Sequence, residues 1–465
     1  MSPSPEPSAV GAAVSRRKFL GGVAAGAGIV LVGGCRAVFG AEASAGVGPL
    51  LTSDGLLDLP QGFRYRVLAE QGVTLLESGH VAPSDPDGAA AFPRRDGPGT
   101  VLVLNHEVGG NERYRVPHVG GLVYDPAAGG GTTTLVVDPD GTVVRHYVSL
   151  AGTEDNCAGG RTPWETWLSC EETENARDRR HGYVFEVDPF DEAANRDPKP
   201  IKALGRFAHE AVVVDPAEDV LYLTEDADEP HGCLYRWTAP ADVRPLGRGS
   251  LRRLADDAGT LEALRASTDD GRHVPDLSEA TDVGTTYRAD WVPVPDRDAE
   301  QLSVRRQFRN DQITRGRKLE GMWWADDGAY VVSSYARTRD GSVHPHDGQV
   351  WYLDPRAGTL TLQLRFGVAD ETDVEPDGPD NITVSPHGGV IIAEDGRGAV
   401  HLLGATVTGE TFFLARRNVA EDADEEFCGP VFSADGQSLF ANLQGPGYTF
   451  MIRGPFDELS RTDGS

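Results

Sequence analysis

The chain has 465 residues and carries 43 Lys and Arg against 72 Asp and Glu, which gives a formal net charge of −29. This charge argues against binding to nucleic acid or to an anionic membrane surface, because both are themselves negative. The 56 Gly and 31 Pro predict frequent turns and few long helices. Composition therefore favours an all-β protein, in which residues 260–267 have the best helical periodicity of any short segment.

Residues 1–43 are predicted to be a twin-arginine signal peptide. The motif Ser-Arg-Arg-Lys-Phe-Leu at residues 15–20 precedes a weakly apolar run, rich in Gly and Ala, at residues 21–34. That run is too short and too rich in glycine to span a membrane. Ordinary cleavage near Ala43 is favoured, and a lipid anchor at Cys35 stays open as the alternative. We therefore expect export by the twin-arginine machinery to the periplasm or the extracellular medium.

A pattern of two short strands with polar residues at both ends recurs in the rest of the chain. Each copy takes about 13 to 15 residues, which suits two antiparallel strands joined by a tight turn. A hairpin ends at the edge where it began, so the polar residues of all copies are expected on one rim. The copies open at Asn156-Cys157, His209-Glu210, Glu320-Gly321, Asp380-Asn381 and Phe427-Cys428, and they close at Glu171-Glu172, Glu225-Asp226, Ser333-Ser334, Glu394-Asp395 and Ala441-Asn442.

Radial repetition of such hairpins is the organisation of a β-propeller, whose inner strands line a central channel. We predict that residues 44–465 form one all-β propeller domain, and we expect a monomer. Six blades fit the number of copies best, with five or seven left open. Residues 240–316 interrupt the pattern with polar and charged side chains. We interpret them as an insertion between blades that could lie over the mouth of the channel.

Acidic groups gathered on one rim predict a binding site for divalent or trivalent cations. Cys157 occupies an opening position at which other copies carry Glu or Asp, and we interpret it as a metal ligand. The sequence has no CxxC pair, so a zinc knuckle is not indicated. We interpret Cys170, Cys233 and Cys428 as packed free thiols or as partners in one disulfide bond.

Several motifs along the chain form a recognisable set. They are Asn105-His106-Glu107, Asn156 to Gly160 with Trp164 to Glu172, Arg206 to Glu210, Glu320-Gly321, Asp380-Asn381-Ile382 and Gly429 to Gly447. As a set they resemble the PhoX family of bacterial alkaline phosphatases, over nearly all of the mature chain. In that family a six-bladed propeller holds ferric iron and calcium ions that hydrolyse phosphate esters. The resemblance implies a phosphoric monoester hydrolase with Fe³⁺ and Ca²⁺ as cofactors and a small phosphate ester as substrate.

The resemblance also implies roles for individual residues, carried over by motif position. The implied iron ligands are Glu107, Cys157, Glu210 and Glu320. The implied oxygen ligands of calcium are Asn156, Glu171, Glu225, Asp226, Asp380 and Asn381. A basic side chain should help to hold the phosphate. For that role Lys318 is preferred over Arg317.

Two other classes of function stay open. A calcium-dependent propeller hydrolase, of the lactonase or phytase kind, would need the acidic rim but not Cys157. A non-catalytic secreted propeller would use the acidic residues only to bind structural calcium. Replacement of Cys157 by serine separates the iron-dependent phosphatase from both alternatives.

Overall fold

The structure is a computed structural model that describes residues 48–459 except 111, 326, 369–375, 397, 407–410 and 419–425. The predicted signal peptide and Cys35 lie outside the described residues. The regular elements of the described part are β-strands and short 3-10 helices. In this part of the chain, no helix has both the length and the apolar character needed to cross a bilayer.

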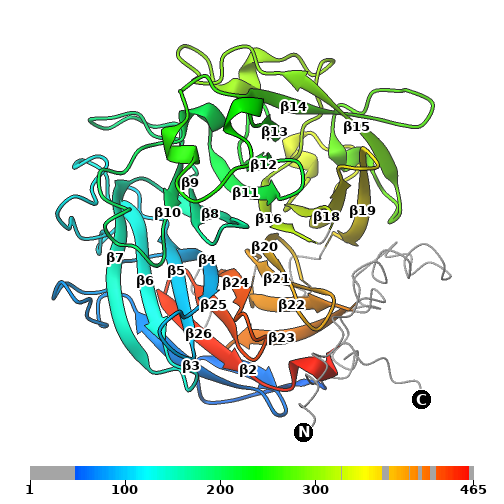
Figure 1. The fold of residues 1–465 in the computed structure, drawn as a ribbon. Coiled ribbons are helices and arrows are strands. Elements are labelled where there is room, and N and C mark those ends of the chain that lie inside the picture. The colour runs from blue at the N-terminus through cyan, green and yellow to red at the C-terminus, as the bar shows by residue number, and fades with distance from the viewer. Residues whose placement is uncertain are drawn as a thin grey trace, which may run out of the picture.

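Six antiparallel units of three or four strands surround a central axis (Figure 1). Blades 1 and 2 are β4 (Pro86–Pro93), β5 (Thr100–His106), β6 (Gly130–Val137), β7 (Val143–Thr153) and β8 (Asn156–Arg161), β9 (Trp167–Glu171), β10 (Val184–Val187). Blades 3 and 4 are β11 (His209–Asp215), β12 (Val220–Glu225), β13 (Leu234–Thr238), β14 (Thr260–Ser267) and β16 (Leu319–Trp324), β17 (Ala329–Ser333), β18 (Gly348–Asp354), β19 (Thr359–Phe366). Blades 5 and 6 are β20 (Pro379–Val384), β21 (Val390–Glu394), β22 (His401–Ala405), β23 (Thr411–Arg417) and β24 (Phe427–Phe432), β25 (Leu439–Leu443), β26 (Tyr448–Arg453), β3 (Arg64–Glu70).

The first strands of the blades form a closed ring. β4 contacts β8, and contacts continue through β11, β16, β20 and β24 back to β4. The remaining strands extend blades or join them: β1 (Leu50–Leu51) and β2 (Leu57–Pro60) continue blade 5, and β15 (Thr286–Pro293) links blades 3 and 4. The predicted all-β propeller is therefore confirmed, and the ring has six members.

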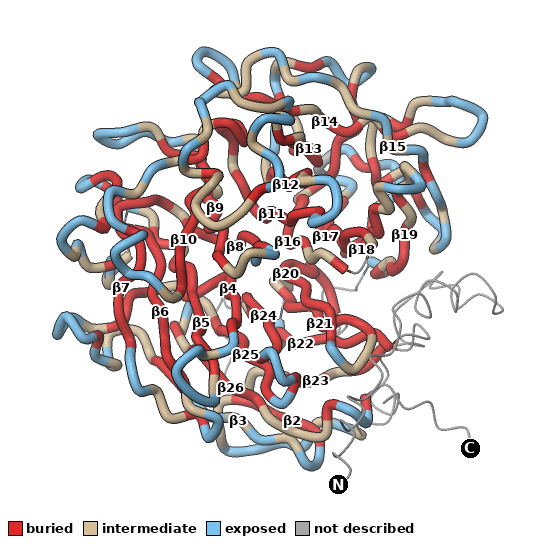
Figure 2. The backbone as a smooth tube through the Cα atoms, viewed as in Figure 1, coloured by how far each residue is buried: buried red, intermediate tan, exposed pale blue. Residues whose placement is uncertain are grey.

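Apolar cores lie between neighbouring blades, which explains why the central strands are buried on both faces (Figure 2). In β11, Val212 and Val214 belong to the core shared with blade 2, whereas Val213 belongs to the core shared with blade 4. This division follows from the period of two residues in a strand, which turns successive side chains to opposite faces. Strands buried on both faces show continuous apolar runs rather than alternation.

The ring is closed by strands from both ends of the chain. β3 pairs antiparallel with β26, so the last blade holds the first long strand, and Val67 lies opposite Phe450. Pairing removes an open edge from each partner, and exposed strand edges are prone to aggregation. Closure therefore joins residues near 65 to residues near 450 in one sheet.

The helical expectation for residues 260–267 is wrong, because this segment is β14. Its side chains divide between two cores: Leu261 packs in the core shared with blade 2, and Leu264 in the core shared with blade 4. Pairing with β13 and β15 thus overrides the local periodicity. The segment predicted as an insertion supplies both β14 and β15 to the sheets.

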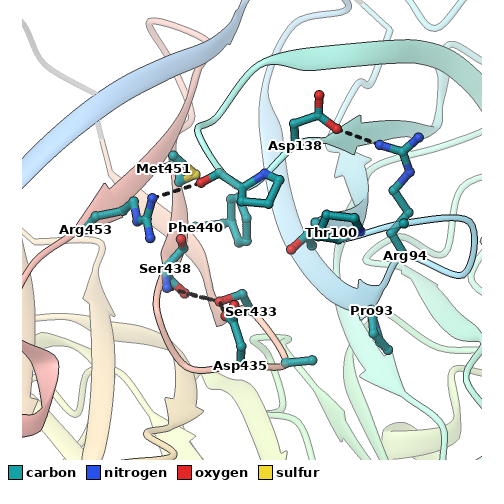
Figure 3. Close-up of a pocket in the computed structure, with 15 residues that line it drawn as sticks. Pro93, Arg94, Thr100, Asp138, Ser433, Asp435, Ser438, Phe440, Met451 and Arg453 are labelled. Carbon is teal, nitrogen blue, oxygen red and sulfur yellow. Dashed lines mark hydrogen bonds and ion pairs between the residues drawn. The ribbon is translucent and has the colours of Figure 1, made fainter.

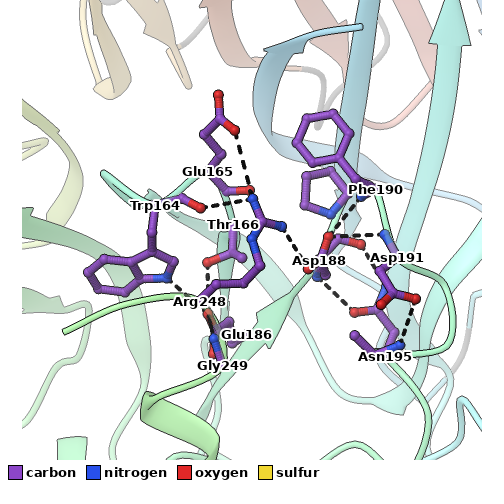
Figure 4. A network of polar contacts seen from close by, with 12 residues as sticks. Trp164, Glu165, Thr166, Glu186, Asp188, Phe190, Asp191, Asn195, Arg248 and Gly249 are labelled. Carbon is purple, nitrogen blue, oxygen red and sulfur yellow. Dashed lines mark hydrogen bonds and ion pairs between the residues drawn. The ribbon is translucent and has the colours of Figure 1, made fainter. Parts of the chain in front are cut away.

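Another part of the insertion contacts blade 2, the blade with three strands. Figure 4 shows the guanidinium of Arg248 among three acceptors: Nη1 lies 2.7 Å from Asp188 Oδ2, and Nη2 donates to the carbonyl oxygens of Trp164 and Glu165 at 2.9 and 3.2 Å. The adjacent Gly249 N–H donates to Glu186. These bonds hold residues 248–249 against the end of blade 2 that contains the β8–β9 turn.

A pocket of about 250 Å³ opens between blades 1 and 6 (Figure 3). It lies beside the β4–β5 and β24–β25 turns, which are at the far ends of β4 and β24 from the predicted site. Its lining includes Arg94, Asp138, Phe440 and Arg453, and none of the residues predicted to bind metal or phosphate.

Candidate metal centre

Each inner strand carries a potential metal-binding side chain at its second position. These residues are Asp87, Cys157, Glu210, Glu320, Asp380 and Cys428. Near this position every inner strand has a register shift against its neighbour in the blade. A bulge of this kind bends the strand and re-aims a side chain. The six strands therefore present these groups at one end of the propeller, which we call the channel rim.

Small residues after these positions let adjacent inner strands approach closely. A Cβ added to Gly321 would lie 2.7 Å from Asn381 Cα, and one added to Gly429 would lie 2.3 Å from the carbonyl oxygen of Asp87. Gly429 also has a positive φ of 59°, which favours glycine. The sequence pattern of a ligand followed by a small residue thus has a steric cause.

A second set of polar residues follows the second strand of most blades. They are Glu107, Glu172, Asp226, Asp395 and Gln444. Gln444 links two blades, because its Nε2 donates to Glu107 Oε2 at 2.6 Å and to Asp87 Oδ2 at 3.0 Å. These contacts agree with the prediction that the first residues of each hairpin and the residues after its second strand lie on the same rim.

Three groups of residues have ligand atoms close enough to share a cation. The ligand atoms of each group lie within 4.8 Å of one another, and the groups are Cys157 with Glu172 and Glu210, Glu210 with Glu320 and Asp380, and Asp87 with Glu426 and Cys428. Glu210 belongs to two groups, so it could bridge two ions. Thiolate with carboxylates is a donor set for transition metals, and carboxylates alone suit calcium.

Burial and crowding strongly perturb these acids. Burial raises the pKa of Glu320 to about 8, although Lys318 opposes the shift. Burial, with repulsion from neighbouring carboxylates, also raises the pKa of Glu210, Glu172 and Asp380 well above the usual range. These shifts favour the protonated forms of the acids, and bound cations would instead favour the ionised forms.

Lys318 lies among the acids with a positive φ of 46°. Its Nζ is 2.8 Å from Asp226 Oδ2 and 3.1 Å from Glu320 Oε1. Arg317 points elsewhere, because its Nε and Nη2 are both 2.8 Å from Asp276 Oδ2 in the insertion. The structure thus brings Lys318 to the channel rim and leaves Arg317 away from it.

Two predicted calcium ligands are engaged inside their blades. Glu171 accepts hydrogen bonds from the N–H groups of Glu154, Gly182 and Tyr183, and His181 Nδ1 is 2.6 Å from its Oε1. Glu225 accepts from Tyr235 and from Arg305. Neither belongs to the three groups, and their role as calcium ligands stays a prediction. The cause is strand alternation: the next residue in each case, Glu172 or Asp226, faces the channel rim.

The two predicted asparagine ligands also have other partners. The Oδ1 atom of Asn156 accepts from Thr153 at 2.5 Å. That of Asn381 accepts from the Gly429 N–H at 2.6 Å. These bonds hold adjacent strands together at the channel rim.

Sequence reasoning missed Asp87, Glu172, Glu426 and Cys428. Pro86-Asp87-Gly88 has the same pattern of a ligand followed by a small residue as the other openings, so a search for that pattern would have found Asp87. Cys428 was interpreted as a packed thiol or half of a disulfide. It is buried and free, as are Cys157, Cys170 and Cys233.

The donor chemistry at the channel rim fits iron and calcium. One oxygen of Asp87, Oδ1, is buried and has no hydrogen-bond partner. A buried carboxylate without a partner is costly, and a cation would satisfy it. The residues present therefore fit the metals that the sequence resemblance implies.

Comparisons with known proteins identify the family to which the chain belongs. The family described as alkaline phosphatase PhoX matches residues 46–144 and 140–447. No curated protein sequence matches the chain. Among solved structures, a gluconolactonase from Xanthomonas campestris is similar with 15% identity and a TM-score of 0.41, covering 88% of this chain and 98% of that one. The PQQ domain of pyranose dehydrogenase from Coprinopsis cinerea has 10% identity and a TM-score of 0.40, covering 87% and 98%. Both likenesses are too distant to bear on function.

The raised pKa values predict how the metal-free protein responds to pH. Glu320 has a folded pKa of about 8 against a reference of 4.5, so above pH 4.5 the unfolded chain releases a proton that the folded state keeps. Stability of the metal-free protein should therefore fall as pH rises from 5 to 8. Urea denaturation with and without a chelator should show a gap between the loaded and stripped forms that widens over this range. A gap that is constant or narrows would contradict the interpretation.

Proposed function

Because the chain belongs to the alkaline phosphatase PhoX family, we propose that it hydrolyses phosphate monoesters at the channel rim. One observation carries the proposal: the ligand atoms of Cys157, Glu172 and Glu210 lie within 4.8 Å of one another. Cys157 and Glu210 stand in motifs through which the sequence resembles this family. A thiolate between two carboxylates would have little use in a propeller that binds only calcium.

In this proposal iron is held by Cys157 together with Glu107, Glu210 and Glu320. Calcium is held by oxygen ligands, among which Glu172, Asp226 and Asp380 are the strongest candidates. Glu172 takes the place that the sequence resemblance implied for Glu171. Glu210 belongs to two of the three groups, so its carboxylate would contribute to the binding of both ions.

Bound cations would supply charge that stabilises the phosphoryl transition state and would activate an oxygen nucleophile. The chain's own residues set the geometry: the bulges aim the carboxylates, and Gln444 holds Glu107 and Asp87 together. Lys318 is proposed to bind a phosphoryl oxygen. Lys318 pairs with Asp226 and Glu320. Cations bound to these two carboxylates would compete with the ion pairs, and the Lys318 ammonium group could then contact the phosphate of the substrate.

Replacement of Cys157 by serine should lower the iron content and should lower hydrolysis of p-nitrophenyl phosphate by at least roughly 100-fold, since a hard hydroxyl is a poor substitute for the thiolate. Elemental analysis and the activity assay should be made on the same sample. Cys170→Ser is the matched control, because Cys170 is equally buried but packs in an apolar core. An iron content and an activity in Cys157→Ser that equal those of the unchanged protein would refute the iron–thiolate site at Cys157.

Replacement of Lys318 by methionine should lower kcat/KM by roughly 100-fold while metal content is retained, since one charged contact to the phosphoryl group is lost. Arg317→Met is the neighbouring control, and its kcat/KM should change little because Arg317 pairs with Asp276. An equal loss in both variants would indicate a structural effect rather than phosphate binding.

Export by the twin-arginine route is part of the same proposal and rests on the sequence of residues 15–34. The double change Arg16→Lys and Arg17→Lys keeps the charge but breaks the motif. The variant should accumulate in the cytoplasm, whereas the unchanged protein should be found in the periplasm or the medium. Export of both forms to equal extent would exclude this route.

A further inference from the structure

Cys428 was interpreted from the sequence as a packed free thiol or as half of a disulfide bond. In the structure it is a buried free thiol at the channel rim. It is the second residue of β24, it is fully buried, and its Sγ is 3.1 Å from the carbonyl oxygen of Pro86 in the next blade of the ring. Asp87 and Glu426 have ligand atoms within 4.8 Å of it and of each other. A thiol and two carboxylates therefore face one small volume.

Cys157 has the same relation to its own neighbour. It is the second residue of β8, and its Sγ is 3.4 Å from the carbonyl oxygen of His209, at the start of the next inner strand. His209 precedes Glu210, as Pro86 precedes Asp87, and in each case that acid is one of the grouped ligands. The two cysteines thus occupy equivalent places in two different blades.

Two buried oxygen atoms beside Cys428 provide a second observation. Asp87 is 3% exposed; its Oδ2 accepts from Gln444, and no N–H or hydroxyl group donates to its Oδ1. The neighbouring acid Glu107 can share a hydrogen bond with Asp87 only while one of the two carboxyl groups is protonated, and the two groups repel each other when both are ionised. Oδ1 of Asn442 is also buried without a partner, and the amide nitrogen of the same side chain donates to the carbonyl of Asp87. Buried oxygens left in this way are rare unless an ion or a water completes them.

We propose that Cys428, Asp87 and Glu426 bind a transition-metal ion, such as iron or zinc, in a second thiolate site at the channel rim. Binding replaces the thiol proton, now donated to the Pro86 carbonyl, and any proton on the two carboxyl groups, and these protons pass to solvent. A thiolate ligand favours a transition metal over calcium, which prefers oxygen ligands. The inference rests on the proposal that the rim is a metal centre, but it does not depend on phosphatase activity.

The test compares metal content per chain in four proteins exported through their own leader: the unchanged protein, Cys428→Ser, Cys157→Ser and the control Cys170→Ser. Elemental analysis should show that Cys428→Ser and Cys157→Ser each lose part of the transition metal, and that Cys428→Ser keeps its calcium. Cys170→Ser should match the unchanged protein. X-ray absorption of the metal left in Cys157→Ser should still show a sulfur ligand, which can come only from the second site.

The possible failures differ in what they overturn. A full complement of transition metal in Cys428→Ser, with loss in Cys157→Ser, would reject the second site and leave the proposed function standing. Absence of transition metal from the unchanged protein would reject both. If Cys428→Ser does not fold, the Cys157→Ser spectrum decides alone, and a metal without sulfur in that spectrum would reject the proposal.

Discussion

Buried carboxylates crowd together at the channel rim, and their crowding determines which ligands the propeller can bind there. Four of the six inner strands bring Asp or Glu to their second position, and the closing turns add further acids. Removal of such groups from water and mutual repulsion both disfavour their charged forms. Lys318 balances only part of this charge. The fold is therefore suited to hold cations, which would offset both effects.

The propeller can tolerate the crowded acids at the rim because the apolar cores between its blades stabilise the fold. Apolar cores between the blades bury both faces of the central strands, and they begin at residues directly beside the rim ligands, such as Ala158 and Ala211. The bulges and small residues then alter only the first residues of each inner strand. An unfavourable group of charges can persist when the surrounding structure fixes it in this way.

The repeated hairpins made the fold and the place of the site predictable from sequence, because polar openings and closings recur at similar spacing. It was harder to predict which of two adjacent acids points into the blade and which points toward the channel. In Glu171-Glu172 and Glu225-Asp226, one residue is bound inside the blade and the next faces the channel, and only the strand register distinguishes them. Cys428 was missed for another reason: its partner Asp87 is distant in sequence. Arg317 and Lys318 precede β16, and Lys318 has a positive φ, so strand periodicity could not distinguish them. The partner of Arg317, Asp276, lies about 40 residues earlier in the chain, and no motif indicated this contact.

Closure of the last blade has a consequence for biosynthesis. The contact between Cys428 and Pro86 joins positions 342 residues apart, and β3 can pair with β26 only after almost the whole chain has left the ribosome. Early blades can pair locally during synthesis, but the ring cannot close around an ion until the end. A cation held by residues of the first and last blades would therefore bind only after synthesis, and a chain truncated before residue 428 would lack both the closed ring and one of the grouped residues.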